Sequence, residues 1–430
     1  MRSGRRKFLG AVGGVGAGLI VGCGLEVGLE DGGFDAGRPP RIDAGPRPGL
    51  SKPPYVQLVG PQRARLRFET RLDHAAVVRV SVDGSAPVSH DPTRSAVDLD
   101  YARPALSARV IADDPGLHVL HEVLLEELPP GVEVSWVVEP PDADPIEGRL
   151  RAPAASGQPF RVGWLADTMQ LGELSAARSA EVLAAQRPDV ALHGGDITYW
   201  TNPLDTWNGI TAALAPLTAL TPLHFIVGNH ELEAMDEVTV QYDRLYGGQG
   251  DPGAAVRYFA YTYGGVRFVC IDTESGGLRE MDSAQLAWLD AELARVDDDP
   301  DLRFAVVGFH RPTYTLSRHA PSSTEVRELL HARFVAHRVP LVLSGHVHAY
   351  ERFAVDGVTY WIDGGAGAVL YDPDQDRDEV EAMRPGESAL RQAVSRSHGV
   401  TTIDVDEDGL TVRRLANEDA GVQDEVRIDV

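Results

Sequence analysis

Hydrophobic and polar residues alternate with a period of two from residue 53 to about residue 151. Apolar residues occupy every second position of 64–68, 78–82 and 132–136, and turns rich in Pro, Gly and Asp separate these segments. A strand that alternates in this way buries one face and exposes the other, and several short strands of this kind are typical of a β-sandwich. We therefore predict that residues 53–151 form an all-β sandwich.

From residue 158 onward the pattern changes, because short apolar runs now alternate with segments of helical composition. The predicted strands are 160–166, 190–193, 223–227, 266–271, 303–309 and 340–343, and the predicted helices are 173–186, 205–217, 283–295 and 323–337. This alternation predicts an α/β layer domain. Strand alternation returns in 400–430, where Asp408-Gly409 indicates a hairpin turn. The polar, acidic segment 371–399 predicts only a loop with one helix.

The first 23 residues have the pattern of an export signal. The pair Arg5-Arg6 precedes an apolar run over 8–22, which is shorter than the roughly 20 residues that span a bilayer. The twin arginine indicates the twin-arginine (Tat) route, and the run ends at Cys23 in a sequence that resembles a bacterial lipoprotein cleavage site. A plain secretory signal, with Cys23 there by chance, is the alternative. Residues 24–52 are rich in Gly, Pro, Asp and Arg and predict a flexible linker.

Charge and cysteine content narrow the choice of partners. The net charge is −24, and it becomes −28 without the four basic residues of positions 1–22. An acidic surface repels nucleic-acid backbones, so we expect no nucleic-acid partner.

With Cys23 lipidated, Cys270 has no partner for a disulfide, and its apolar strand context predicts a small buried hydrophobe. We thus expect an exported bacterial protein, a periplasmic or cell-surface lipoprotein held at the membrane through Cys23 only.

Metal-binding side chains directly follow five of the predicted strands. They are Asp167, Asp196, Asn229, His310, and the pair His346 and His348. Open α/β sheets build their sites at the carboxyl ends of the strands, so we expect these side chains to converge. Oxygen and nitrogen donors of this kind, set in the glycine-containing blocks GGDITY, GNHE and GHVHAYER, suit two metal ions. This set of donors predicts a two-metal hydrolase, a reaction that requires no nucleophilic Ser, and we find no GxSxG motif.

These blocks resemble those of the calcineurin-like metallophosphoesterases and, within them, of the purple acid phosphatases. The corresponding blocks occur in order as Asp167, 194–199, 228–231, 307–310 and 345–352. The resemblance covers roughly residues 53–370, because such phosphatases often place a fibronectin type III-like sandwich before the catalytic domain. It implies a calcineurin-like α/β/β/α sandwich as the catalytic domain, over 158–430. The first block departs from the usual Gly-Asp-x-Gly, with Ala166 and Met169 in place of the glycines.

The resemblance also implies a role for each ligand. Asp196 would bridge two metals, with Asp167, Tyr199 and His348 completing one site and Asn229, His310 and His346 the other. Many metallophosphoesterases have a His where this chain has Met169, and Tyr199 would restore the missing donor. A phenolate suits Fe(III), whereas Asn and His suit a divalent ion such as Fe, Zn or Mn. The alternative for Tyr199 is an aromatic side chain packed beside Trp200.

Two histidines are candidates for contact with the substrate. His230 follows Asn229 and in the family faces the phosphoryl group, and His319 lies nine residues after His310. The alternative for His319 is a solvated loop residue. We interpret three other histidines as structural: His193, His224 and His337.

The implied function is hydrolysis of small phosphomonoesters, as in acid phosphatases. A metal-held hydroxide would attack phosphorus, and His230, together with His319, would supply a proton to the leaving group. A phosphodiesterase on the same metal core is the first alternative. The second is a non-catalytic binding lipoprotein in which the β-sandwich is the working part.

Overall fold

The computed structural model describes residues 50–99, 115–140, 144–170, 176–200, 205–232, 236–253, 255–275 and 283–430. The predicted export signal (1–23), the lipid acceptor Cys23 and nearly all of the predicted linker (24–52) lie outside these residues.

Two four-stranded sheets form the N-terminal region, as the alternating pattern predicts. One has the order β1 (Leu50–Leu58), β2 (Ala64–Thr70), β6 (Gly116–Leu125), β5 (Thr93–Leu99), and the other β4 (Val88–His90), β3 (Val77–Val82), β7 (Glu133–Glu139), β8 (Ile146–Arg151). Leu66 and Phe68 of β2 and Val78 of β3 are fully buried in one hydrophobic cluster. The all-β prediction is confirmed, and a specific likeness to fibronectin type III domains stays a prediction.

The rest of the described chain contains two larger sheets. The first has the order β11 (Leu223–Phe225), β10 (Val190–His193), β9 (Phe160–Leu165), β19 (Gly399–Val405), β20 (Gly409–Ala416), β21 (Val422–Asp429). The second has the order β12 (Phe259–Tyr263), β13 (Val266–Cys270), β14 (Phe304–Phe309), β15 (Leu341–Ser344), β17 (Val358–Asp363), β16 (Tyr350–Val355), β18 (Arg391–Ser395). The strands β9–β11 are parallel to one another, as are β13, β14, β15 and β17.

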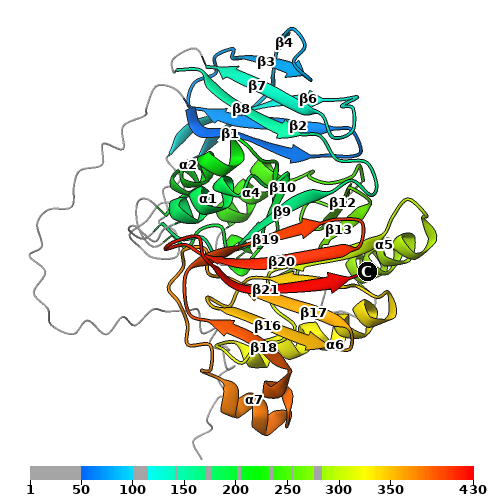
Figure 1. Ribbon diagram of the computed structural model, residues 1–430. Coiled ribbons are helices and arrows are strands. Elements are labelled where there is room, and N and C mark those ends of the chain that lie inside the picture. Colours follow the sequence, from blue (N-terminus) through cyan, green and yellow to red (C-terminus); the bar gives the residue numbers. More distant parts are fainter. Residues whose placement is uncertain are drawn as a thin grey trace, which may run out of the picture. The chain divides into compact units, whose positions relative to one another are not determined.

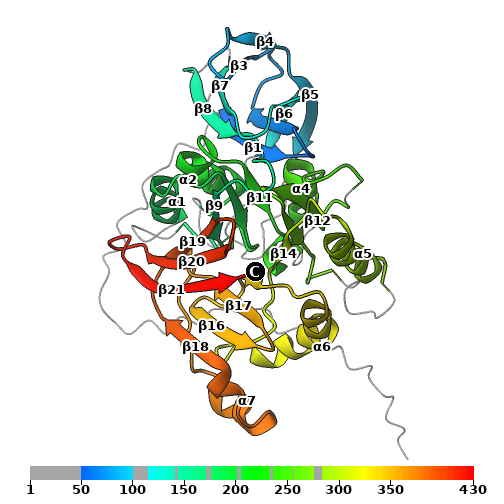
Figure 2. The ribbon, with the colours of Figure 1, turned by 45° about the vertical axis from the view of Figure 1, so that its right-hand side comes forward.

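Helices cover the outer faces of these two sheets (Figures 1 and 2). The helices of the described chain are α1 (Ala176–Ala185), α2 (Trp207–Thr218), α3 (Asn229–Leu232), α4 (Asp236–Tyr246), α5 (Ala284–Asp298), α6 (Ala320–Ala336) and α7 (Arg377–Met383). The covering helices are α1, α2, α4, α5 and α6. One buried cluster joins α1, α2 and α4 to the first sheet, and another joins α5 and α6 to the second. With a third cluster between the sheets, the layers are α/β/β/α, which confirms the predicted fold class.

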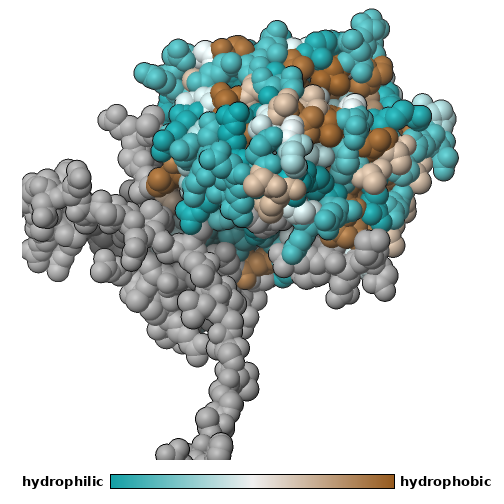
Figure 3. Space-filling model, turned by 90° about the horizontal axis from the view of Figure 1, so that it is seen from below, coloured by the Kyte–Doolittle hydropathy of each residue, from teal (hydrophilic) through white to brown (hydrophobic). Residues whose placement is uncertain are grey.

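Polar residues predominate on the face of the molecule shown in Figure 3, and apolar residues form small groups between them. Within the described parts of the chain, no helix combines the length and the apolarity that crossing a membrane requires.

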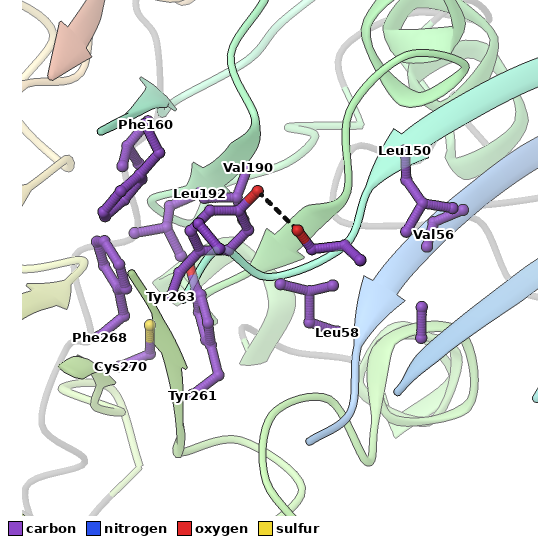
Figure 4. Packing of buried hydrophobic residues seen from close by; sticks show 14 of the residues in the cluster. Val56, Leu58, Leu150, Phe160, Val190, Leu192, Tyr261, Tyr263, Phe268 and Cys270 are labelled. Atoms are coloured by element: carbon purple, nitrogen blue, oxygen red, sulfur yellow. Dashed lines mark hydrogen bonds between the residues drawn. The ribbon is translucent and has the colours of Figure 1, made fainter. Parts of the chain in front are cut away.

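The strand residues alternate between the two sides of each sheet. In β10, Val190 and Leu192 belong to the cluster between the sheets, whereas Ala191 packs toward the helices. In Figure 4, Val190 and Leu192 lie near Tyr263 of the facing sheet. Cys270 is buried in the same cluster, as its strand pattern predicts.

Several elements differ from the sequence-based prediction. Helix α6 begins at Ala320, three residues before the predicted start, with a proline in its first turn, where a missing N–H costs nothing. The segment 371–399 contains α7, a 3-10 helix (Glu387–Leu390) and the strand β18. Strand β18 is an edge strand without a fully buried residue, so no hydrophobic alternation marks it.

Polar contacts join the N-terminal sheets to the α/β layers. Tyr55 of β1 donates a hydrogen bond to the carbonyl oxygen of Leu245 in α4. Glu69 of β2 is fully buried and binds both Lys52 of β1 and Arg244 of α4. The two parts of the chain therefore share a buried ionic cluster.

Candidate metal centre

The predicted ligands lie in loops that follow parallel strands of both large sheets. Asp167 follows β9, Asp196 and Tyr199 follow β10, Asn229 follows β11, His310 follows β14, and His346 and His348 follow β15. Backbone hydrogen bonds tie the first two loops together, because Asp167 N donates to Gly195 O at 3.0 Å and Thr168 N donates to Asp196 O at 3.0 Å. The structure brings all seven residues into two adjoining groups.

One group surrounds the imidazole of His310. Its Nε2 atom lies 3.2 Å from Asp196 Oδ2, 3.2 Å from Asn229 Oδ1 and 3.2 Å from His346 Nδ1. Three different loops thus direct potential ligand atoms toward a single point. Among the described residues, Asp196, His310 and His346 also form a cluster whose donor atoms all lie within 4.8 Å of one another.

The second group surrounds the phenol of Tyr199. Its hydroxyl donates to Asp167 Oδ1 at 2.9 Å and lies 2.9 Å from His348 Nε2. Asp167 also links the two groups, because its Oδ2 accepts a hydrogen bond from His346 N at 2.8 Å. Met169 is buried beside Tyr199 in a small apolar cluster, so this position contributes packing around the phenol.

Backbone carbonyls orient two of the histidines. His310 Nδ1 lies 2.8 Å from Gly194 O, and His348 Nδ1 lies 2.8 Å from Val369 O. A carbonyl oxygen can only accept, so each Nδ1 carries a proton, and each Nε2 is the atom left to bind a cation once that cation displaces any proton there. Such outer contacts are the usual way in which proteins fix a histidine as a metal ligand.

Three predicted ligands have a left-handed backbone conformation. Asp167, Asp196 and His346 have φ angles of 59°, 51° and 67°, a region that non-glycine residues rarely adopt. Residues held in this conformation cluster at functional sites. The neighbouring glycines allow close approach, since a Cβ on Gly228 would lie 2.3 Å from Asp196 Oδ1 and one on Gly345 would lie 2.6 Å from Asp167 Oδ2.

The buried acidic groups of the site favour the binding of cations. Burial raises the pKa of Tyr199 well above its ordinary value, and Asp167 and Asp196 add to this. Burial opposes ionisation of Asp196 and of His310, but their mutual attraction prevails, lowering the pKa of the carboxyl and raising that of the imidazole to about 10. A phenolate beside two carboxylates requires a strongly charged cation. The donor set therefore fits two metal ions, which also match its oxygen and nitrogen chemistry.

The two predicted substrate-facing histidines lie beside these groups. His230 has its ring 4.3 Å from that of Tyr199, and its Nε2 lies 3.8 Å from Asp196 Oδ2. The ring of His319 lies 4.6 Å from that of His346. Burial, followed by the charges of Arg318 and Arg311, lowers the pKa of His319 to about 4. Each histidine interpreted as structural contacts a residue that is not a predicted ligand. His193 is bound to Thr168 Oγ1, His224 stacks on Tyr261 and His337 pairs with Asp297.

Three further residues shape the site without having been singled out from the sequence. The buried carboxylate of Glu231 accepts hydrogen bonds from the backbone N–H groups of Asp196, Ile197 and Gly228 at 2.8–3.0 Å. Arg311 Nη1 lies 2.9 Å from His346 Nε2, and Tyr371 stacks on His348 at 4.0 Å. Glu231 lies inside the block GNHE and Arg311 directly follows His310. Their positions beside predicted ligands could therefore have indicated that they belong to the site. Tyr371 has no such motif.

This fold and this arrangement of side chains are similar to those of metallophosphoesterases. Residues 160–350 match the family of calcineurin-like phosphoesterases. The match over this part of the chain, together with the plant relatives below, confirms the resemblance to metallophosphoesterases of the purple acid phosphatase type.

Several curated plant proteins are similar to this chain. It is 30% identical over 176 residues to "Purple acid phosphatase 22" of Arabidopsis thaliana, and the matched region covers 39% of this chain and 40% of the relative. It is 25% identical over 308 residues to "Purple acid phosphatase 1" of Ipomoea batatas, covering 62% and 59%. It is also 27% identical over 297 residues to "Probable inactive purple acid phosphatase 9" of Arabidopsis thaliana, covering 58% and 45%. The chain thus spans about half the length of these relatives.

Two solved structures share the fold. The purple acid phosphatase PPD1 from yellow lupin superposes with a TM-score of 0.71 at 19% identity, covering 87% of this chain and 74% of the lupin chain. PhoD superposes with a TM-score of 0.58 at 14% identity, covering 87% and 88%. At these identities the similarity supports the fold alone.

Proposed function

We propose that the protein is a binuclear metal-dependent phosphatase that hydrolyses small phosphomonoesters. The observation that carries this proposal is the pair of donor groups around His310 Nε2 and the Tyr199 hydroxyl, each with partner atoms 2.9–3.2 Å away. Asp167, Tyr199 and His348 would hold one cation and Asn229, His310 and His346 the other, with Asp196 between them.

The chemistry divides between the cations and the side chains. When bound, two cations would neutralise charge on the phosphoryl group and lower the pKa of a coordinated water. The imidazoles of His310 and His230 lower the pKa of Asp196 and so favour its charged form, and the carbonyls of Gly194 and Val369 orient two imidazoles with Nε2 toward the site. His230 is partly exposed next to Asp196, a place from which its imidazole could protonate a leaving alkoxide. His319 lies beside His346, where it could contact the ester, but its lowered pKa makes it a poorer proton donor than His230 near neutral pH.

We propose Fe(III) at the Tyr199 group and a divalent ion (Fe, Zn or Mn) at the other. A phenolate next to two carboxylates favours the harder, more highly charged ion, whereas the imidazoles and the amide of Asn229 suit a divalent one. Tyrosinate bound to Fe(III) is coloured, so a visible absorption band of the purified protein tests this assignment. A colourless, metal-replete and active protein would remove iron from the first site.

Metal analysis combined with ester hydrolysis tests the function. The purified full chain is reconstituted with iron and zinc or manganese, and its metal content is measured. Rates with p-nitrophenyl phosphate and bis(p-nitrophenyl) phosphate are then compared. We expect two metals per chain and faster hydrolysis of the monoester. Preference for the diester would favour a phosphodiesterase, and absence of both metal and activity would leave a non-catalytic binding protein.

We further propose that the protein acts outside the cytoplasm as a lipoprotein anchored through Cys23. The support is the sequence pattern of residues 1–23. Radiolabelled palmitate should label the wild-type chain and not the Cys23→Ala variant. Equal labelling of the two chains, or none of either, would overturn the lipid anchor.

A further inference from the structure

Two segments far apart in the sequence meet beside the metal-binding histidines. Three hydrogen bonds join the segment that leads into α6 (316–320) to the segment that precedes α7 (371–376). Ser317 Oγ donates to Asp372 O at 2.7 Å, Asp376 N donates to Leu316 O at 3.0 Å, and Ala320 N donates to Asp376 Oδ2 at 3.3 Å. These contacts hold the two segments as one unit, so the side chains between them have a defined position.

Tyr371 is fixed against the site at both its backbone and its ring. Its N–H donates to His348 O at 2.9 Å, and its ring stacks on the His348 imidazole at 4.0 Å with an interplanar angle of 18°. The guanidinium carbon of Arg318 lies 5.2 Å from the centre of the Tyr371 ring. This is the geometry of a cation–π contact, which positions the charged group over the ring.

The loop that carries Arg318 is strained at the neighbouring residue. His319 has a φ angle of 75°, and this conformation places its ring 4.6 Å from His346 and 5.9 Å from Tyr371. Arg318 is half-buried, and it carries a positive charge on a chain whose net charge is −24. A strained loop that brings a cation next to the reaction centre indicates a role in binding an anion.

We propose that Arg318 and Tyr371 form a binding site for the leaving group that selects phosphate esters whose alcohol carries a second anionic group, such as a carboxylate. This inference rests on the proposed phosphatase function. The planar guanidinium matches the two oxygens of a carboxylate, and its contact with Tyr371 holds it beside the site. The transferable phosphoryl group would lie at the metal-binding residues, and the second anion would lie toward Arg318.

Two substrates that differ mainly in this second charge test the proposal. The substrates are 3-phosphoglycerate and glycerol 3-phosphate, and kcat/KM is measured for both with the metal-loaded wild type and its variants. We expect the wild type to favour 3-phosphoglycerate. Arg318→Gln should lower the ratio of the two kcat/KM values roughly 10- to 100-fold, mainly through KM for 3-phosphoglycerate. Tyr371→Leu should change the ratio in the same direction, whereas Tyr371→Phe should retain it.

Arg338→Gln is the matched control, because Arg338 is 84% exposed at the other end of α6, where it pairs with Asp297. It should leave the ratio unchanged. Equal losses for both substrates in Arg318→Gln, or no change in the ratio, would overturn the leaving-group site. If the wild type hydrolyses neither ester nor p-nitrophenyl phosphate, the proposed phosphatase function itself fails, which is a separate outcome.

Discussion

The hydroxyl of Tyr199 lies 2.9 Å from Nε2 of His348, although 149 residues separate the two in the chain. The same hydroxyl donates to Asp167 Oδ1, so the phenol lies between a carboxylate and an imidazole. Its pKa is raised well above the ordinary value by burial and by the two nearby carboxylates. Such a phenol ionises readily only when a cation replaces its proton, which makes it a sensitive reporter of metal binding.

Tyr199→Phe should therefore abolish the visible absorption of the iron-loaded protein and lower its iron content. The ring and its packing against Met169 are kept, so the fold should not change. Tyr263→Phe is the control, because Tyr263 is also buried but its hydroxyl makes only long hydrogen bonds, to Arg151 O at 3.4 Å and Ala152 O at 3.3 Å. A Tyr199→Phe variant that keeps the absorption band would show that the phenol is not a ligand.

Much of the fold could be predicted because its determinants are local. Alternation along β3 separates Val78 and Val80 from Arg79, and the two valines are buried in the hydrophobic cluster whereas Arg79 is exposed. The candidate ligands each follow a strand directly, so the meeting of parallel strand ends was enough to predict that they converge. The division of the strands into two sheets came from the family resemblance and not from the pattern.

The features that could not be predicted depend on contacts between distant segments. Tyr371 lies in an acidic segment without a motif, and only the packing of that segment against His348 gives it a place at the site. Strand β18 pairs with β16 through backbone hydrogen bonds that need no apolar side chains. Glu231 belongs to a recognised block, but its function follows from hydrogen bonds to a loop 34–35 residues away.

Asp196→Asn should remove most of the bound metal and reduce kcat/KM at least about 1,000-fold, because a neutral amide cannot replace a shared carboxylate between two cations. Metal content by mass spectrometry and hydrolysis of p-nitrophenyl phosphate measure the two effects. Asp356→Asn, which alters a 68% exposed carboxylate paired with His331, should change neither. Full metal retention in the Asp196→Asn variant would contradict the bridging role.

Glu231→Gln should weaken metal binding through the ligand loops, without altering any ligand. The carboxylate accepts three backbone N–H groups, and an amide offers only one acceptor oxygen, so buried donors lose their partner. We expect a metal affinity about 10- to 100-fold lower and a loss of about 1–3 kcal/mol in the free energy of unfolding. Metal titration and denaturant unfolding measure these effects. Glu328→Gln, on the exposed face of α6, is the control, and equal behaviour of the two variants would refute the positioning role.

The buried cluster around Glu69 predicts a specific acid sensitivity of the stability. Burial alone would raise the pKa of this carboxyl, but Lys52, His118 and Arg244 together hold it well below its ordinary value. The sign follows from that depression: the stabilisation is fully present above the unfolded-state pKa of about 4.3 and is lost as the pH falls toward the folded-state value. Because Arg244 belongs to α4, the effect should reach the junction between the N-terminal sheets and the α/β layers.

Glu69→Gln should destabilise the protein near pH 7 by roughly 3–5 kcal/mol, since it leaves the cations of Lys52 and Arg244 without their buried partner. Below about pH 4 the difference between variant and wild type should shrink, because the wild-type carboxylate is then being protonated. The wild type should lose up to about 1.4 kcal/mol more per pH unit than the variant across this range. Denaturant unfolding from pH 3 to pH 7 measures both slopes, with Glu147→Gln on the exposed side of β8 as the control. Parallel slopes for wild type and Glu69→Gln would mean that the carboxylate is not held ionised by the cluster.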